Sequence, residues 1–169
     1  ETAGKVVFLC QGQGSQKPGM LAELFVAFPR LHRILEIGAR WAPLMLPPAA
    51  FSADEQKAQA AALTDTRVAQ PALGMADLAM AELLRACGVA PDMLAGHSYG
   101  ELVALAASGR MSERDLFTLS RVRGKLMADQ RPGDPGAMLA VFAAPPVDAT
   151  VIAREKLNVV VANRNAPKQ

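Results

Sequence analysis

The chain has 169 residues, of which 51% are hydrophobic and 20% are charged, and its formal net charge is +2. This length fits about one domain, and the composition can bury a substantial core, which excludes a disordered or acidic-tail sequence. The balanced charge, without a cluster of basic residues among aromatics, argues against nucleic acid or a membrane surface as a partner. No apolar run approaches the ~20 residues that a membrane helix needs.

The cysteines indicate the redox state of the cellular compartment in which the protein works. Cys10 and Cys87 are the only cysteines, they lie far apart, and each has apolar neighbours. We therefore expect buried free thiols in a reducing cytoplasm and no disulfide frame. With two cysteines and two histidines at no recognised spacing, we expect no zinc site. The first residues show no secretory leader pattern.

The first third of the chain begins with a strand pattern. Residues 5–10 form a continuous apolar, β-branched run that predicts a buried central strand, and the glycine-rich residues 11–19 predict a loop after it. Helices are expected over about 20–28 and 31–41. The proline-containing and then polar residues 42–62 predict a loop and a surface helix.

The helix expected over residues 71–87 has the clearest amphipathic pattern. Its apolar residues fall within about one third of the circumference at 100° per residue. Asp77, Glu82 and Arg85 occupy the opposite side. Pro71 suits a first helical turn and Gly88 suits a C-terminal stop, so we expect this helix to cover a sheet.

The second half of the sequence continues the alternation of strands and helices. A short strand leads into Ala95, a sharp turn and an alanine-rich helix follow, and a further helix is expected over about 113–129. Two prolines and two glycines within residues 131–136 predict a subdomain boundary. Beyond it, a strand over 137–142, a helix over 147–156 and a strand over 157–162 form a β-α-β pattern. The whole arrangement predicts an α/β fold.

The strongest chemical signal is the nucleophile-elbow pattern G-x-S-x-G at Gly96, Ser98 and Gly100. A serine between a strand and a helix sits in a strained turn, and only glycines two residues away let the neighbouring backbone pass closely. The hydroxyl then stands at a helix N-terminus, where developing negative charge is stabilised. A plain turn is the alternative, but the strand before and the helix after favour a catalytic Ser98.

A serine hydroxyl is a weak nucleophile without an adjacent base. His97 is next to Ser98 and cannot easily reach around to serve it, so we expect His97 to be held by hydrogen bonds beneath the site and to help shape it. His32 lies among charged residues on an expected surface helix. The catalytic base is therefore predicted to lie beyond Gln169.

The loop around Gln13 and the turn at Tyr99 are candidates for an oxyanion hole. A tetrahedral acyl intermediate needs two N–H groups near one oxygen. One comes from the residue after the nucleophile, Tyr99, and the other from a loop after a neighbouring strand, here at Gln13. The loop matches neither phosphate-binding glycine pattern, and a glycine turn without a catalytic part remains an equal alternative.

Arg123 is the candidate substrate anchor. On the expected helix it shares a face with Leu116, Leu119 and Met127, whereas Arg121 and Lys125 lie elsewhere. An arginine directed into an apolar pocket needs an anion, and a guanidinium fits a carboxylate. A solvated surface charge is the alternative, and the pattern alone favours it.

Six motifs occur in an order that resembles a known family. They are Gly12-Gln-Gly-Ser-Gln16, Ala69-Gln-Pro-Ala-Leu73, Gly96-His-Ser-Tyr-Gly-Glu101, Arg123-Gly124, Gly136-Ala-Met138 and Asn163-Arg-Asn-Ala-Pro-Lys-Gln169. The chain is similar to malonyl-CoA:acyl carrier protein transacylases, both the free-standing enzymes of fatty-acid synthesis and the acyltransferase domains of polyketide and fatty-acid synthases. The resemblance covers essentially the whole chain.

The resemblance implies an α/β-hydrolase-like large subdomain with a parallel sheet, interrupted by a ferredoxin-like small subdomain. Residues 1–131 would be the N-terminal part of the large subdomain and 132–169 the first β-α-β half of the small one. Members have roughly twice this length, with a histidine base in the second half. The family usually has proline before Gly12, where this chain has Gln11, and Tyr99 is expected to reshape the pocket floor.

The resemblance also implies the chemistry. Ser98 would take a malonyl group from CoA, with Gln13 and Tyr99 N–H groups holding the oxyanion and Arg123 holding the malonyl carboxylate. Three further residues, Gln70, His97 and Asn165, would line the site. The phosphopantetheine thiol of an acyl carrier protein would then accept the group, neighbouring synthase domains are further candidate partners, and neither a metal nor a redox cofactor is needed.

Two alternative functions remain open at this point. A serine esterase or thioesterase uses the same elbow, although it has no use for a carboxylate clamp at Arg123. The second alternative is that the chain alone is an inactive fragment, because it lacks the catalytic histidine. The sequence separates neither malonyl from methylmalonyl nor a free-standing enzyme from a synthase domain.

Overall fold

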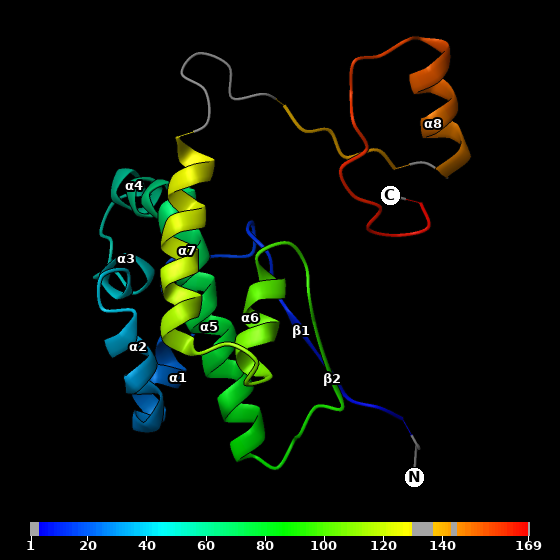
Figure 1. Cartoon of the computed structure of the whole chain (residues 1–169). Helices are drawn as coiled ribbons and strands as arrows, with labels where there is room; N and C mark the ends of the chain where they lie inside the picture. The colour runs from blue at the N-terminus through cyan, green and yellow to red at the C-terminus, as the bar shows by residue number, and fades with distance from the viewer. Residues whose placement is uncertain (1–3, 130–136, 143–144, 169) are drawn as a thin grey trace. The chain divides into compact units, whose positions relative to one another are not determined.

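A computed structural model describes residues 4–129, 137–142 and 145–168 of the chain, and the side chains of 145–149 are left aside (Figure 1). The chain divides into two compact units, Glu1–Gln130 and Arg131–Gln169.

The first unit contains a pair of parallel strands, β1 (Val7–Cys10) and β2 (Met93–Gly96). Their register pairs Val7 with Met93 and Cys10 with Gly96, so both strands end at the same edge. Helix α6 (Gly100–Ala107) packs against both strands, and α5 (Thr66–Ala86) packs against α6. The expected mixed α/β organisation is therefore present.

The expectation of a buried central strand is wrong for this chain. Cys10 is buried, but Val7 is 39% and Leu9 is 73% exposed. A strand is buried on both faces only when a layer lies on each side. Among the described residues, helices cover the face of β1 that carries Cys10, and the alternate side chains stay exposed.

Helix α5 begins earlier than the sequence pattern predicts. It starts at Thr66, where the Asp65 side chain accepts the N–H of Arg67 at 2.9 Å and caps the helix. Pro71 therefore lies inside the helix and not in its first turn. The predicted stop is correct, because Gly88 follows the helix with a φ of 83° that suits glycine.

The remaining helices of the first unit surround α5. Their bounds are α1 Ala22–Ala27, the 3₁₀ turn η1 Pro29–Leu31, α2 His32–Ile37, α3 Ala42–Met45, α4 Ala53–Thr64 and α7 Glu113–Ala128. The single helix expected over 31–41 is interrupted at Gly38, where a methyl group would lie 2.1 Å from the Met75 sulfur. None of the helices in the described part of the chain is long and apolar enough to cross a membrane.

The core of this unit lies between α5 and the helices around it. Helices α5 and α7 run side by side (Figure 1). Fully buried apolar side chains come from η1 and from each of the helices α2 to α7, and they include Leu31, Ile34, Met45, Leu63, Leu73, Met75, Val103 and Leu116. This packing fixes α7 relative to the N-terminal end of α6, which positions the site described below.

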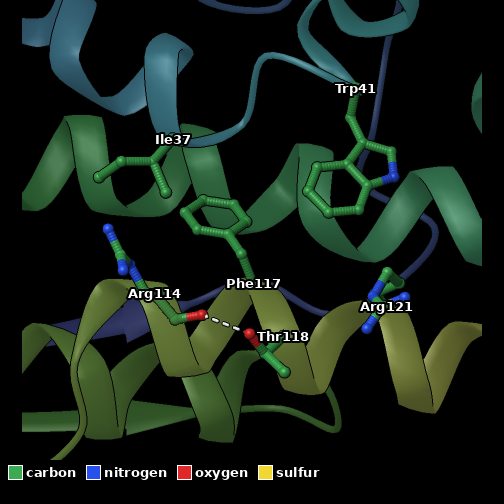
Figure 2. A pocket seen from close by; sticks show the side chains of 6 residues that line it. All are labelled: Ile37, Trp41, Arg114, Phe117, Thr118 and Arg121. Carbon is green, nitrogen blue, oxygen red and sulfur yellow. Dashed lines mark hydrogen bonds between the residues drawn. The ribbon is translucent and has the colours of Figure 1, made fainter.

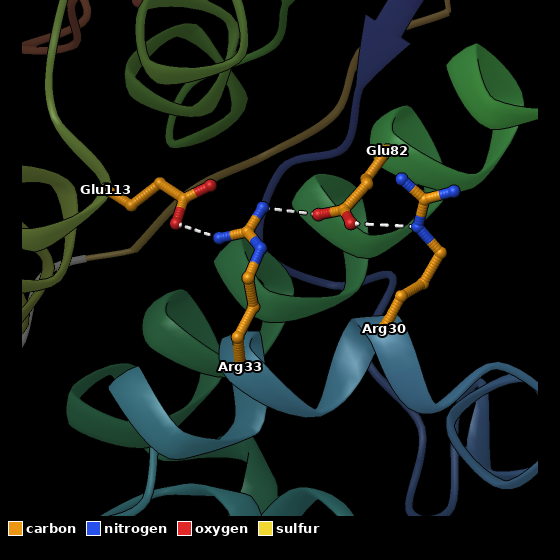
Figure 3. A network of polar contacts seen from close by, with 4 residues as sticks. All are labelled: Arg30, Arg33, Glu82 and Glu113. Atoms are coloured by element: carbon orange, nitrogen blue, oxygen red, sulfur yellow. Dashed lines mark hydrogen bonds and ion pairs between the residues drawn. The ribbon is translucent and has the colours of Figure 1, made fainter.

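An exposed polar network also joins three of the helices (Figure 3). Arg33 pairs with Glu82 of α5 and with Glu113 of α7, the latter at 2.5 Å, and Arg30 pairs with Glu82 at 3.3 Å. Exposed pairs of this kind contribute about 0–1 kcal/mol each. The network therefore orients η1 and α2 on the core but adds little to stability.

The second unit contains helix α8 (Pro145–Arg154), in the region where a helix over 147–156 is expected. The two flanking strands that the sequence predicts, over 137–142 and 157–162, are not formed. Their apolar side chains are exposed, for example Met138 at 97% and Val160 at 90%. A strand needs a hydrogen-bonded neighbour, and the described residues here supply none. The predicted break over 131–136 and the end residue Gln169 lie outside the described residues.

Candidate active site

Ser98 stands in the turn between β2 and α6 with a φ of 55°, a left-handed conformation that non-glycine residues rarely adopt. Its side chain is exposed. A methyl group at Gly96 would lie 2.1 Å from the backbone of Gly100, and one at Gly100 would lie 2.2 Å from the Cys10 carbonyl oxygen. The two glycines are thus required by close backbone approach, and the strained turn presents the hydroxyl to solvent.

The loop after β1 lies beside this turn. A methyl group at Gly12 would lie 2.7 Å from the carbonyl oxygen of His97 and 3.0 Å from its Nδ1. The His97 side chain is exposed and flanks the loop, so it does not lie beneath the site as expected. Gln13 is exposed, and its side-chain amide donates to the Thr66 hydroxyl at 3.0 Å. The loop and the turn that carry the two predicted N–H donors therefore meet at one place.

Arg123 of α7 reaches the same place. Its Nη2 donates to Ser98 Oγ at 3.4 Å, and its side chain is half-buried. Arg121 and Lys125, its neighbours on the helix, are exposed and line another part of the surface. The sequence pattern alone favours a solvated charge at Arg123, and the structure brings this arginine next to Ser98.

Tyr99 supports the turn from below. Its ring is fully buried, and its hydroxyl lies 2.7 Å from Ser120 Oγ, which in turn donates to the Leu116 carbonyl at 2.6 Å. Burial raises the pKa of Tyr99. A methyl group at Gly74 would lie 2.5 Å from the Tyr99 hydroxyl oxygen. The side chain therefore lies in the core, and its expected effect on the pocket floor stays a prediction.

Gln70 of α5 is also fully buried, and it contacts α7, the helix that carries Arg123. Its Nε2 lies 3.3 Å from the sulfur of Met127, one helical turn beyond Arg123. Its Oε1 is buried and has no hydrogen-bond partner in the described part of the chain. A buried, unsatisfied amide oxygen costs about 1–3 kcal/mol.

Asn165 lies in the second unit, and its role as a residue that lines the site stays a prediction. His32, which the sequence pattern places on a surface helix, is exposed. A ring nitrogen of His32 lies 2.7 Å from the Phe25 carbonyl oxygen, which ties α2 to α1 and fits a structural role. No group of three or more potential metal-binding side chains occurs among the described residues.

Sequence reasoning missed two contributors. No sequence motif indicates Ser120, because its role is to form a hydrogen bond with Tyr99, which lies 21 positions away in the sequence. Asp77 was expected on the polar, outward side of its helix, but it is partly buried and accepts the N–H of Gln11 at 2.8 Å. The expectation of two buried thiols is correct for Cys10 only, because Cys87 is exposed.

A pocket of about 280 Å³ lies elsewhere, between α2, α3 and α7 (Figure 2). Its lining residues are Ile37, Trp41, Arg114, Phe117, Thr118 and Arg121. The rings of Trp41 and Phe117 stack at 6.1 Å between centroids. Ser98 is not among the lining residues, so this hollow is separate from the candidate active site.

A serine on a tight strand–turn–helix connection, beside a glycine loop and an arginine, defines a class of enzymes that act through an acyl-serine. The family model described as acyl transferase domain matches residues 7–169. The chain belongs to this family, and the resemblance inferred from the motifs is confirmed.

Relatives and solved structures agree with the family assignment. The chain is 36% identical to malonyl CoA-acyl carrier protein transacylase of Bacillus subtilis, covering 98% of this chain and 52% of the relative. It is 37% identical to a spectinabilin polyketide synthase protein of Streptomyces orinoci, covering 98% and 8%. The crystal structure of the malonyl-CoA:acyl carrier protein transacylase of Xanthomonas oryzae matches with a TM-score of 0.80 and 36% identity over 99% of this chain and 53% of that chain. The chain thus spans about half the length of the free-standing relatives.

Proposed function

We propose that the chain carries the nucleophile and the carboxylate anchor of an acyltransferase. The enzyme moves a malonyl or related carboxyacyl group from CoA to the phosphopantetheine thiol of an acyl carrier protein, in polyketide or fatty-acid synthesis. The observation that carries the proposal is the 3.4 Å contact between Arg123 Nη2 and Ser98 Oγ. A cation at the nucleophile suits an acyl donor whose far end is a carboxylate.

The relatives support the donor and the acceptor. Those from Bacillus subtilis and Mycobacterium bovis are named malonyl CoA-acyl carrier protein transacylase. A solved complex of a type II polyketide synthase carrier protein with its malonyl-transacylase is 31% identical, with a TM-score of 0.64 over 76% of this chain and 40% of that chain. We extend both partners, malonyl-CoA and a carrier protein, to this chain.

In the proposed reaction, Ser98 Oγ attacks the thioester carbon of malonyl-CoA while a base takes its proton. The N–H groups of Gln13 and Tyr99 hold the oxyanion of the tetrahedral intermediate. Collapse expels the CoA thiol, which takes up a proton, and leaves an acyl-serine ester. The carrier's thiol then attacks this ester, and the serine hydroxyl is restored, which gives ping-pong kinetics.

Other parts of the proposal follow from the family resemblance. The base is a histidine beyond Gln169, and Gln70, His97 and Asn165 border the substrate. Residues 1–131 belong to an α/β-hydrolase-like subdomain, and 132–169 begin a ferredoxin-like one whose strands form on pairing with the rest of it. The reaction needs neither metal nor redox cofactor and takes place in the cytoplasm. Neighbouring synthase domains are candidate partners.

Mass spectrometry of the full-length protein after incubation with malonyl-CoA tests the proposal. We expect a malonyl adduct on the peptide that contains Ser98, and its release when an acyl carrier protein with its phosphopantetheine arm is added. The Ser98→Ala variant is the control and should show no adduct. A folded wild-type protein that forms no adduct would refute the acyltransferase function.

A further inference from the structure

A carboxylate lies directly under the loop that follows β1. Asp77 of α5 accepts the backbone N–H of Gln11 through Oδ2 at 2.8 Å. Gln11 is the first residue after β1 and precedes Gly12 and Gln13. The bond therefore fixes the peptide that leads into the proposed oxyanion donor, and it connects residues 66 positions apart in the sequence.

Helix α5 holds the same loop at a second point. The side-chain amide of Gln13 donates to the hydroxyl of Thr66, at the first residue of the helix. His97 limits the loop on another side, because its carbonyl oxygen leaves no room for a methyl group at Gly12. The first part of the loop is thus attached to one helix at two points, Gln11 and Gln13, and Asp77 is the charged attachment.

The environment of Asp77 is unfavourable for a charge. Among the described residues, none of the ion pairs includes Asp77. Burial raises the pKa of its carboxyl group to about 6, and the Gln11 N–H acts in the opposite direction. The carboxylate therefore depends on one backbone N–H as its hydrogen-bond donor in this part of the chain.

Two neighbouring ionisable groups, Cys10 and Tyr99, stay neutral near neutral pH. Cys10 at the end of β1 is neutral, because burial and the Asp77 charge raise its pKa to about 11. Tyr99 at the start of α6 is neutral for the same reasons, since its pKa is also raised. Arg85 donates to the Ala107 carbonyl at 2.7 Å. Of Asp77, Cys10 and Tyr99, Asp77 alone has a raised pKa near neutral pH. His97 and Arg123 are the other ionisable side chains beside the loop and the turn.

We propose that Asp77 is a positioning residue of the acyl-transfer site, whose carboxylate orients the oxyanion loop by accepting the Gln11 N–H. The inference rests on the proposed function, and it adds a residue that the family resemblance does not supply. A proline at position 11, as the family usually has, lacks an N–H. The anchor therefore belongs to chains that have a donor at this position.

The chain offers a matched control at the other end of β1. Asp92 accepts the backbone N–H of Val6 at 2.7 Å, so it is also an aspartate that anchors a strand end through one amide. This anchor lies at the end of the strand pair opposite to Ser98. Asp92→Asn should disturb a strand end without affecting the loop.

The first test follows the Gln11 amide signal by NMR in the isotope-labelled full-length protein between about pH 5 and pH 8. We expect a titration step with a midpoint near pH 6 that is lost in Asp77→Asn and unchanged in Asp92→Asn. A wild-type amide that does not titrate, or a titration curve that is the same in Asp77→Asn as in the wild type, would overturn the proposal.

The second test is a double-mutant cycle on the rate of Ser98 acylation at saturating malonyl-CoA. Asp77→Ala and Gln11→Pro should each lower the rate about tenfold, with less than a twofold change in KM, since one orienting hydrogen bond is lost. The double variant should lose no more than either single variant. Losses that multiply to about a hundredfold, or a wild-type rate in Asp77→Ala, would overturn the proposal.

The two tests separate this inference from the proposed function. If wild-type Ser98 takes no acyl group, the acyltransferase function fails and the catalytic part of the inference fails with it, while the Gln11 titration still shows the anchor. If Ser98 is acylated but the cycle is additive, only the role of Asp77 is wrong. Circular dichroism at the assay temperature confirms that each variant is folded.

Discussion

The two ends of α6 both have a glycine, but for opposite reasons. At the start, a methyl group at Gly100 would lie 2.2 Å from the Cys10 carbonyl oxygen, so the residue is fixed by lack of space. After the end, Gly109 has a φ of 75° and nothing within 4 Å of a methyl group, so it is fixed by backbone conformation. Close approach thus marks the end that carries the proposed nucleophile.

The surroundings of the two ends differ accordingly. The start of the helix gathers Ser98, the loop after β1 and the arginine of α7. The far end is closed by two backbone hydrogen bonds, Gly109 N–H to Ala106 and Arg110 N–H to Leu105, which form a Schellman motif. A perturbation at the start should therefore change acyl transfer, and one at the far end should change stability alone.

The largest effect is expected for Gly100→Ala. The added methyl group meets backbone of β1, which cannot move aside as a side chain can, so the free energy of unfolding should fall by about 3 kcal/mol or more. Acylation of Ser98 should be lost as well. Chemical denaturation and mass spectrometry measure the two effects. A variant with wild-type stability and acylation would contradict the close approach.

The second largest effect is expected for Arg123→Ala, and it should depend on which acyl-CoA is used. Arg123→Ala should lower acylation by malonyl-CoA about a hundredfold, about 2.7 kcal/mol, because the carboxylate loses its cationic partner. Acetyl-CoA has no carboxylate, so its slower reaction should change less than about threefold.

Arg121→Ala is the matched control for this experiment. It removes the same charge from the same helix, but its side chain lines the separate pocket of Figure 2. It should leave both acylation rates unchanged. Equal losses with malonyl-CoA and acetyl-CoA in Arg123→Ala would argue against the clamp and favour an esterase that uses the same elbow.

The sequence was sufficient where structure is determined locally. The turn at Ser98 needs glycines two residues away on each side, a strand before and a helix after, and all of these are visible in about a dozen residues. The stop of α5 at Gly88 is predicted for the same reason. Six ordered motifs then indicated the family, which the comparisons confirm.

The sequence was insufficient where a property depends on distant residues. The apolar run of β1 predicts burial, but exposure of Leu9 depends on which layers cover the sheet. The strands expected over 137–142 and 157–162 need partners that a local pattern cannot supply. Asp77 looked like a surface charge because its contact with Gln11 spans much of the chain.

The third prediction concerns stability and pH at the functional end. The pKa of Asp77 is raised from 3.8 to about 6 in the folded protein, so the unfolded chain releases its proton first as pH rises. Stability therefore falls between about pH 4 and pH 6, and the full cost is present above pH 6.

Asp77→Asn removes this cost. The variant should be more stable than the wild type by about 2 kcal/mol near pH 8, since each pKa unit corresponds to about 1.4 kcal/mol and the loss of the charged hydrogen bond offsets part. The difference should shrink toward pH 5. Urea denaturation at several pH values measures it. A variant that is less stable than the wild type near pH 8 would show that the charge is not costly.

The smallest effect is expected at the far end of α6. Gly109→Ala should lower the free energy of unfolding by about 1 kcal/mol, because an alanine in the left-handed region is strained even where space is available. Gly109→Asn should lose less, since asparagine tolerates this region better. Neither variant should change the rate of Ser98 acylation. Because α6 is one short helix, a loss of acylation in Gly109→Ala as large as in Gly100→Ala would mean that its two ends are mechanically coupled, and the distinction between a catalytic end and a structural end would fail.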